Sequence, residues 1–298
     1  MTLSLYDLLI APFAGFSFMR VALAACLALA LSGGPLGVLL LLRRMALDGN
    51  VLSHAVMPGA ALGFVYAGHS PAALSLGGFA SGALVAALTG LLSRKRATRQ
   101  DAGLVVFYLV ALAFGVTLVA FFGSNVDTVR VLFGTVLAIN PSTLVQIASV
   151  GTATMLALAV FYRSIMVDAF DPMFLRMAGI RGIRALFMLL VLLNLVVSFQ
   201  TFGTLLAIGP ILLPAAAARC WTNRPGLMMA LAVLIGMLSS YVGLLLSYHR
   251  NLPSGPAIVM VAGALYGASV LASSGLASSG LASSGLRVLR TRLRGNGR

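Results

Sequence analysis

Long apolar runs separated by short polar gaps repeat along the chain from residue 17 to residue 272. Each run is near the roughly 20 residues that an α-helix needs to cross about 30 Å of hydrocarbon. Backbone polar groups in lipid need internal hydrogen-bond partners, so we expect these runs to be helices. The pattern predicts nine membrane spans, at about residues 17–42, 49–68, 71–92, 102–122, 142–162, 185–201, 203–218, 226–247 and 257–272.

The seventh run is the least regular, because it is short and contains Pro210 and Pro214. Proline removes a backbone donor and bends or breaks a helix. If this segment re-enters the membrane from one side, the count falls to eight spans. The first run is also interrupted, by Gly33, Gly34 and Pro35. With eight spans or with nine, the predicted fold class is an all-α membrane protein, a polytopic helical bundle.

Composition supports this fold class and restricts the partners. The chain has 298 residues, of which 60% are hydrophobic and 9% are charged, whereas a soluble domain carries about 25% charged residues. A net charge of +14 would indicate nucleic-acid binding in a soluble protein. Here the basic residues lie in the gaps between apolar runs, so membrane lipid with anionic headgroups is the expected partner and nucleic acid is not.

Basic residues also predict the orientation in the membrane. If the spans alternate, 17 of the 20 Lys and Arg residues fall on one side, and only Arg20, Arg130 and Arg250 fall on the other. The positive-inside rule then places the N-terminus outside and the C-terminus in the cytoplasm.

Three regions follow from this pattern. Residues 1–16 form a mildly amphipathic N-terminal segment, which we expect at the membrane interface. Residues 17–272 form the transmembrane domain. Residues 273–298 form a low-complexity basic tail on the cytoplasmic side, where the Ala-Ser-Ser-Gly-Leu repeats that begin at residue 272 precede five arginines. Small flexible residues of this kind are typical of a linker.

Several catalytic motifs are missing. Lys95 is the only lysine and follows no phosphate-binding glycine loop, and the chain contains no glutamate for an H-E-x-x-H zinc site. The chain is therefore not expected to be an enzyme of either kind, and the family resemblance described below implies that ATP would be bound by a partner.

Polar residues at membrane depth gather in one stretch, which carries Asp48, Asn50 and His54 ahead of Pro58. His54 lies about ten residues beyond the nearest arginine, or about 15 Å along a helix, close to the bilayer midplane. Asn50 and His54 are spaced i, i+4 and share one helix face. An imidazole nitrogen beside an amide or carboxylate oxygen suits passing Zn²⁺ or Mn²⁺. A histidine that only hydrogen-bonds to a neighbouring helix is the alternative.

The two other histidines, His69 and His249, fall at ends of spans that face outward. Each is a candidate for helping a metal cation to enter. The alternative for both is an ordinary interfacial residue.

The polar connection at residues 163–184 carries a different signal. Asp171 followed by Pro172 is typical of a helix start, and Gly179 is typical of a helix end. The short helix between them would present Phe174, Leu175 and Met177 to a groove on a cytoplasmic partner. Alternatively, this helix lies on the membrane surface.

With these residues in place, the chain resembles the integral-membrane permeases of the zinc, manganese and iron ABC importers, the ABC-3 or zinc-uptake permease family. The resemblance covers about residues 17–270, and the G-x-x-L-S-H-A-V-x-P-G stretch is its most specific part. The matching stretches, in family order, are Gly34–Gly37 followed by Arg43–Met45, Gly49–Gly59, Leu132–Pro141, Phe170–Gly179, Gly203–Ala218 and Leu252–Pro256.

The resemblance implies a homodimer of permeases, a cytoplasmic ABC ATPase, and a periplasmic or extracellular metal-binding protein. It also implies the cytoplasmic (inner) membrane of a bacterium. The metal, zinc or manganese, would be cargo, and no cofactor would be bound permanently. Residues 170–179 match the segment that couples such permeases to the ATPase. Asn50 departs from the family pattern, in which an aspartate forms a metal site with the residue that matches His54.

Three function classes are compared on these grounds. The leading hypothesis is an ABC permease that moves a divalent metal into the cytoplasm. An ion-coupled secondary transporter is a second class, but it needs ionisable residues near the midplane, and of six aspartates only Asp48 lies near membrane depth. A degenerate, non-transporting permease is the third class, which Asn50 keeps open.

Overall fold

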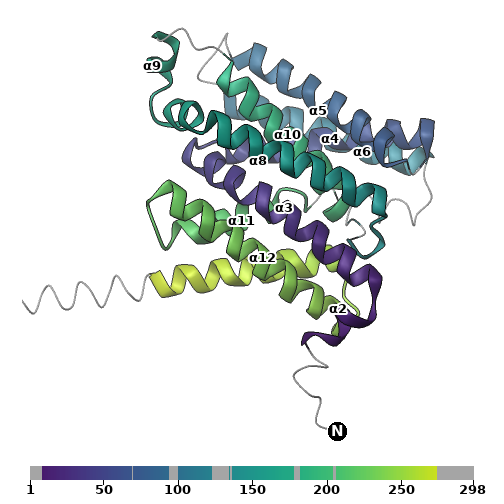
Figure 1. The fold of residues 1–298 in the computed structure, drawn as a ribbon. Coiled ribbons are helices and arrows are strands. Elements are labelled where there is room, and N and C mark those ends of the chain that lie inside the picture. The colour runs from purple at the N-terminus through teal and green to yellow at the C-terminus, as the bar shows by residue number, and fades with distance from the viewer. Residues whose placement is uncertain are drawn as a thin grey trace, which may run out of the picture.

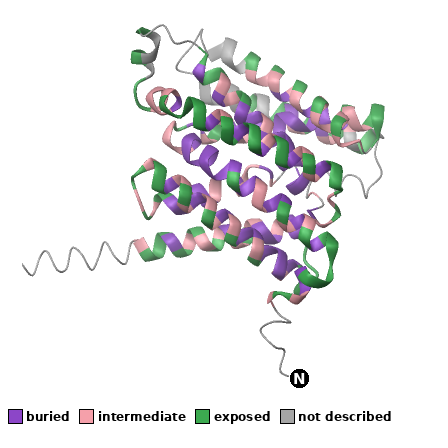
Figure 2. Ribbon diagram, viewed as in Figure 1, coloured by how far each residue is buried: buried purple, intermediate pink, exposed green. Residues whose placement is uncertain are grey.

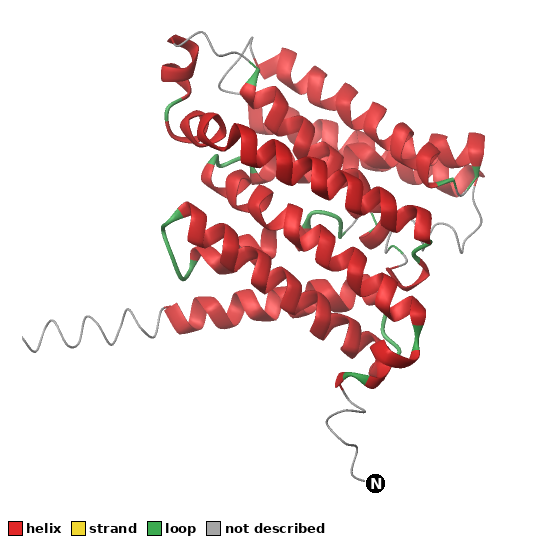
Figure 3. Ribbon diagram, in the orientation of Figure 1, coloured by secondary structure: helices red, strands yellow, loops and turns green. Residues whose placement is uncertain are grey.

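The computed structural model describes residues 9–68, 70–93, 100–122, 134, 136–177, 182–203 and 206–273, and these residues form helices without any strand (Figure 3). Before the long polar connection the helices are α2 (Ala11–Gly15), α3 (Ser17–Leu42), α4 (Ala46–Ala67), α5 (Pro71–Ser93), α6 (Gln100–Phe122), the 3-10 helix η2 (Val136–Ala138) and α8 (Pro141–Phe170). After it come α9 (Pro172–Met177), α10 (Ile183–Phe202), α11 (Gly209–Arg219), α12 (Pro225–Arg250) and a final helix, Ser254–Ser273.

The predicted all-α membrane bundle is confirmed. Six of the described helices are long and apolar enough to cross a bilayer. Two more, α4 and α6, have 22 and 23 residues. The first span runs without a break, because α3 stays helical through Pro35.

The seventh predicted span differs from a regular helix. Among its described residues, only the 11 residues of α11 are helical, and they span about 16 Å. Phe202, before the segment, packs with Met19 near the start of α3. Ala218, at its end, packs with Val38 near the end of α3. The chain therefore still passes from one end of the bundle to the other, as a short helix preceded by non-helical residues.

Helix α3 runs through the centre of the bundle. It lies between α8 on one side and α11 and α12 on the other, while α4, α5 and α6 pack together and α10 joins them to α8 (Figure 1). Its most apolar stretch is 72% buried, the largest share among the candidate spans (Figure 2). Gly37 permits this packing, since a Cβ there would lie 2.0 Å from the Ile211 carbonyl oxygen of α11.

Glycines also bring α4 and α5 into backbone contact. A Cβ on Gly59 would lie 2.0 Å from the carbonyl oxygen of Gly77, and one on Gly63 would lie 2.4 Å from that of Ala73. Small residues allow helices in membranes to approach this closely, where dispersion and polar contacts hold them together. The contact fixes the position of α4, the helix that carries His54.

The bundle has two distinguishable ends. The arginine-rich end is defined here by Arg43, Arg44, Arg163, Arg184, Arg219 and Arg224, which lie at or near helix ends. At the opposite end, the ring of Phe13 in α2 stacks on that of Tyr241, with centroids 5.2 Å apart, and the Tyr241 hydroxyl donates to the Leu9 carbonyl. The short helix α2 thus packs on the bundle. The basic tail beyond Ser273 lies outside the described residues.

Candidate functional site

His54 is the ninth residue of α4, about 12 Å along the helix from Ala46. Its side chain is buried, with 5% exposed. Asn50, one turn closer to the arginine-rich end, is half-buried, and its carbonyl oxygen accepts a 2.8 Å hydrogen bond from the Ser53 hydroxyl. The predicted pair therefore lies on one continuous helix, one turn apart.

The helix face that carries this pair is covered by a neighbouring helix in its later half. At 100° per residue, Asn50, His54, Met57 and Ala61 follow the i, i+4, i+7, i+11 pattern of one face. Met57 and Ala61 pack against Leu112, Val116 and Leu118 of α6. The face predicted for Asn50 and His54 is therefore covered by α6 at Met57 and Ala61, buried at His54 and half-buried at Asn50.

The helix ladder is altered just after His54. Pro58 has no N–H and cannot donate to the carbonyl of His54, four residues earlier. The next N–H, of Gly59, donates to the Ser81 hydroxyl of α5 at 3.2 Å, and that hydroxyl donates to the Ala55 carbonyl at 2.7 Å. The Ser81 hydroxyl of α5 therefore bonds to both an N–H and a carbonyl of α4 that are four residues apart.

Metal-ligating side chains are sparse. Within the part of the chain that the structure describes, no three His, Cys, Asp or Glu side chains are placed to hold a metal ion. The donors that α4 brings together at this depth are the imidazole of His54 and the amide of Asn50. Two neutral donors on one helix suit brief contact with a passing cation.

His249 lies far along the chain, in the last turn of α12, where it is exposed and its Nδ1 lies 2.9 Å from the Leu245 carbonyl oxygen. Helix α12 packs on α3 and α11, so the structure does not bring His249 together with His54 on α4. His69, the other predicted entry residue, lies outside the described residues.

The predicted helix in the polar connection is present as α9. The Asp171 carboxylate accepts hydrogen bonds from the N–H groups of Met173 and Phe174, both at 3.1 Å, as an N-cap does. The side chains of Met173, Phe174 and Met177 are 63%, 60% and 85% exposed, and their spacing places them along one side. Pro172 begins the helix. The side chain of Leu175 is not described, and Gly179 lies outside the described residues.

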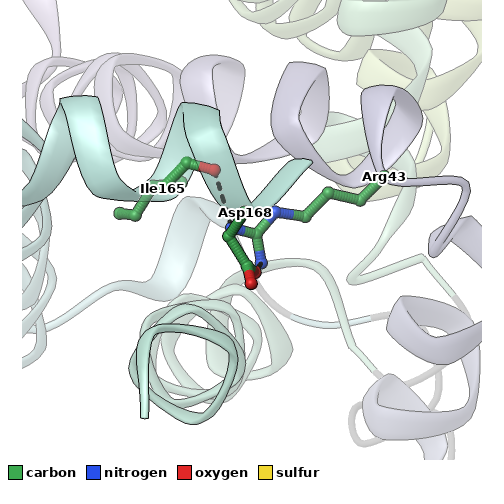
Figure 4. A network of polar contacts seen from close by, with 3 residues as sticks. All are labelled: Arg43, Ile165 and Asp168. Carbon is green, nitrogen blue, oxygen red and sulfur yellow. Dashed lines mark hydrogen bonds and ion pairs between the residues drawn. The ribbon is translucent and has the colours of Figure 1, made fainter. Parts of the chain in front are cut away.

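Sequence reasoning missed a buried ion pair at the arginine-rich end (Figure 4). Arg43, which follows α3, places its Nη1 3.0 Å from Oδ2 of Asp168 in α8. Its Nη2 donates to the Ile165 carbonyl at 2.9 Å, and its guanidinium lies 4.2 Å from the ring centre of Phe187 in α10. Burial lowers the pKa of Arg43, Asp168 opposes that effect, and nearby Arg184 adds to it.

A helical bundle with several membrane-crossing helices, a polar pair on one of them and an exposed apolar helix at its arginine-rich end is a multi-pass membrane protein. The chain belongs to the ABC 3 transport family, which it matches over residues 15–273. Members of this family are permease subunits, so this chain is not the enzyme that hydrolyses ATP.

Relatives extend over nearly the whole chain. The manganese transport system membrane protein MntC of Halalkalibacterium halodurans is 31% identical over 261 residues, which are 87% of this chain and 88% of MntC. The manganese import system permease protein ScaB of Streptococcus parasanguinis is 30% identical over 253 residues, 84% of this chain and 89% of ScaB. A solved structure of PsaBC from Streptococcus pneumoniae in complex with Fab is similar with a TM-score of 0.80 and 28% identity, over 87% of this chain and 93% of that one.

Proposed function

We propose that this chain is the permease of an importer that moves a divalent metal, manganese in the first place, into the cytoplasm of a bacterium. One observation carries the proposal: the chain is similar over more than four-fifths of its length to permeases that are named for manganese transport. ATP hydrolysis in a separate cytoplasmic subunit would drive the movement. The membrane is the inner, cytoplasmic one.

The orientation follows from charge. The arginine-rich end faces the cytoplasm, because positively charged loops are retained on that side. The opposite end, with His249, then faces the metal-binding protein that delivers the ion. A second copy of the chain completes the permease as a homodimer.

His54 and Asn50 lie on the path of the ion. Manganese accepts oxygen donors such as amide and carbonyl groups, and it binds a given nitrogen site more weakly than zinc does. A site of one imidazole and one neutral amide holds a Mn²⁺ ion loosely, and loose binding favours fast release. Asn50 in place of an aspartate thus fits a path through which the ion passes without being stored.

The exposed side of α9 contacts the ATPase. Met173, Phe174 and Met177 expose large apolar side chains at the end that faces the cytoplasm, where a groove on a partner would cover them. The capping carboxylate of Asp171 keeps this short helix formed while it is pushed.

The experiment is ⁵⁴Mn²⁺ uptake in the native host grown under metal limitation, with the gene deleted and then restored on a plasmid. Deletion is expected to lower uptake at least tenfold, and restoration should recover it. Unlabelled Zn²⁺ and Fe²⁺ as competitors rank the metals. Equal uptake with and without the gene would exclude the proposed function, and stronger competition by Zn²⁺ or Fe²⁺ than by Mn²⁺ itself would replace manganese as the cargo.

A further inference from the structure

We propose that the Arg43–Asp168 ion pair is a positioning contact that transmits movement of α9 to α4, the helix that carries His54. This inference rests on the proposed function, since it assigns a route between the ATPase-facing helix and the metal path. Neither the metal path nor the exposed side of α9 uses these two residues, although they form a buried charged contact in an otherwise apolar bundle.

On one side, the pair is joined closely to α9. Helix α8 runs without a break to Phe170, and Asp171 then caps α9. Asp168 is only three residues before that cap. Arg43 also bonds to the carbonyl of Ile165, about one turn earlier, so it holds the last turns of α8 at two points. Any shift of α9 that moves the end of α8 therefore displaces the guanidinium.

On the other side, the pair is joined closely to α4. Arg43 is three residues before Ala46, where α4 begins. The joint between the helices is tight: Arg44 has a φ of 57°, in the left-handed region, and the Met45 N–H donates to the Leu40 carbonyl at 2.9 Å. Bonds of this type close a helix end in a fixed geometry. The joint therefore passes on a displacement instead of absorbing it.

Burial prevents water from replacing the contact. The side chains of Arg43 and Asp168 are only 3% and 16% exposed. Beneath them, Met45, Ile165 and Phe187 belong to one apolar cluster. A charge in such a place that loses its partner has no ready substitute, so α3, α8 and α10 are expected to move together at this point.

The packing of the helices makes this route a direct one. Helix α8 packs on α3 and α10, whereas the neighbours of α4 are chiefly α5, α6 and α10. The end of α8 therefore reaches α4 through α10 or through the joint between α3 and α4. Arg43 contacts both, because it lies at the joint and its guanidinium covers Phe187 of α10.

The test uses the full-length chain, purified with the ATPase subunit that assembles with it and reconstituted into liposomes. Mn²⁺ uptake and ATP hydrolysis are measured together for the wild type, Arg43→Gln and Asp168→Asn. Each variant is expected to lower uptake per recovered complex at least tenfold, while ATP hydrolysis stays within twofold. The double variant should lose no more than either single variant, because residues that act as one contact are not additive.

Arg184→Gln is the matched control, since it removes an exposed arginine close to the pair, and its ratio of uptake to hydrolysis should stay within twofold of the wild type. Arg43→Lys keeps the charge, but an ammonium cannot bond to Asp168 and to the Ile165 carbonyl at once as the forked guanidinium does. The ratio of uptake to hydrolysis should therefore fall about threefold for this variant. If the Arg43→Gln protein does not accumulate in the membrane, Arg43→Lys tests the role of the ion pair in its place. An unchanged ratio, or a loss of both activities in proportion, would overturn the inference. No uptake by the wild type would instead refute the proposed function.

Discussion

The proposed metal path around His54 and the ion pair at the arginine-rich end use polar groups in opposite ways. The donors proposed to meet the ion are neutral and few, the His54 imidazole and the Asn50 amide, with the Ser81 hydroxyl close by and a proline that weakens the helix ladder. At the other place two opposite charges are buried against each other on top of an apolar cluster.

The difference shows how one small bundle can keep the site that an ion would pass apart from the contact that would transmit helix movement. Charges at membrane depth are expensive and bind cations strongly, so neutral donors suit a site that an ion must leave. A buried ion pair adds little net stability, but removing one of its two charges is costly. Such a pair therefore suits a contact that has to stay formed while helices move. The variants below test this contrast, beginning with the one that should do the most damage.

Gly59→Ala tests whether the metal-path helix depends on backbone contact. The added Cβ would lie 2.0 Å from the Gly77 carbonyl oxygen and 2.4 Å from the Ser81 hydroxyl. Since backbone cannot give way cheaply, we expect a loss of about 3 kcal/mol, at the upper end for overpacking, and less than a tenth of the wild-type protein in the membrane. Gly263→Ala is the control, because its Cβ would meet nothing within 4 Å and helix propensity favours alanine. Equal levels of the two variants would contradict the close α4–α5 contact.

His54→Ala tests the passage function itself. It removes the nitrogen donor from the helix face that carries Asn50, and we expect ⁵⁴Mn²⁺ uptake to fall at least tenfold, or about 1.4 kcal/mol, with a normal amount of protein. His249→Ala removes an exposed imidazole at the opposite end and should cost less than threefold. Normal uptake by His54→Ala would show that its imidazole is a packing group.

Most helix positions could be predicted from apolar run length alone, because a bilayer sets the length of each span. The predicted and observed bounds of α3 agree, and those of α10 differ by two residues or fewer. Helix α8 extends to Phe170, eight residues past the predicted end of its span. Its last turns leave the apolar run and are held by Arg43, a tertiary contact that no periodicity contains.

The candidate site likewise combines features that the sequence predicts with contacts that it does not. The depth of His54 and the shared face with Asn50 follow from counting along a helix, and the Asp171 cap follows from a local motif. The contacts of Arg43 join residues 122 positions apart, so the sequence indicated a basic loop residue and not its partner. One signal was present: Asp168 is an acidic residue in a gap dominated by arginines, where an ion pair is a natural expectation.

Asn50→Asp sharpens the contrast by placing a charge on the metal path. The carboxylate would attract a divalent ion beside His54, and we expect the Mn²⁺ concentration for half-maximal uptake to fall about tenfold, or about 1.4 kcal/mol, with a lower maximal rate because release slows. Asn50→Leu, similar in size and uncharged, should raise that concentration. If Asn50→Asp and Asn50→Leu gave the same uptake curve, this helix face would not contact the ion.

Ser81→Ala should have the smallest effect. It removes a hydroxyl that accepts from the Gly59 N–H and donates to the Ala55 carbonyl, but these two groups are four residues apart in a continuous helix, where each is the ordinary partner of the other. The net loss should therefore be about 1 kcal/mol, a decrease in Tm of about 2–4 °C for the detergent-solubilised protein. Ser149→Ala is the control, because that exposed hydroxyl donates only within its own helix, and its Tm should change by less than 1 °C. A loss several times larger for Ser81→Ala would mean that the contact of this hydroxyl with α4, and not the helix itself, holds the turn after His54 in place.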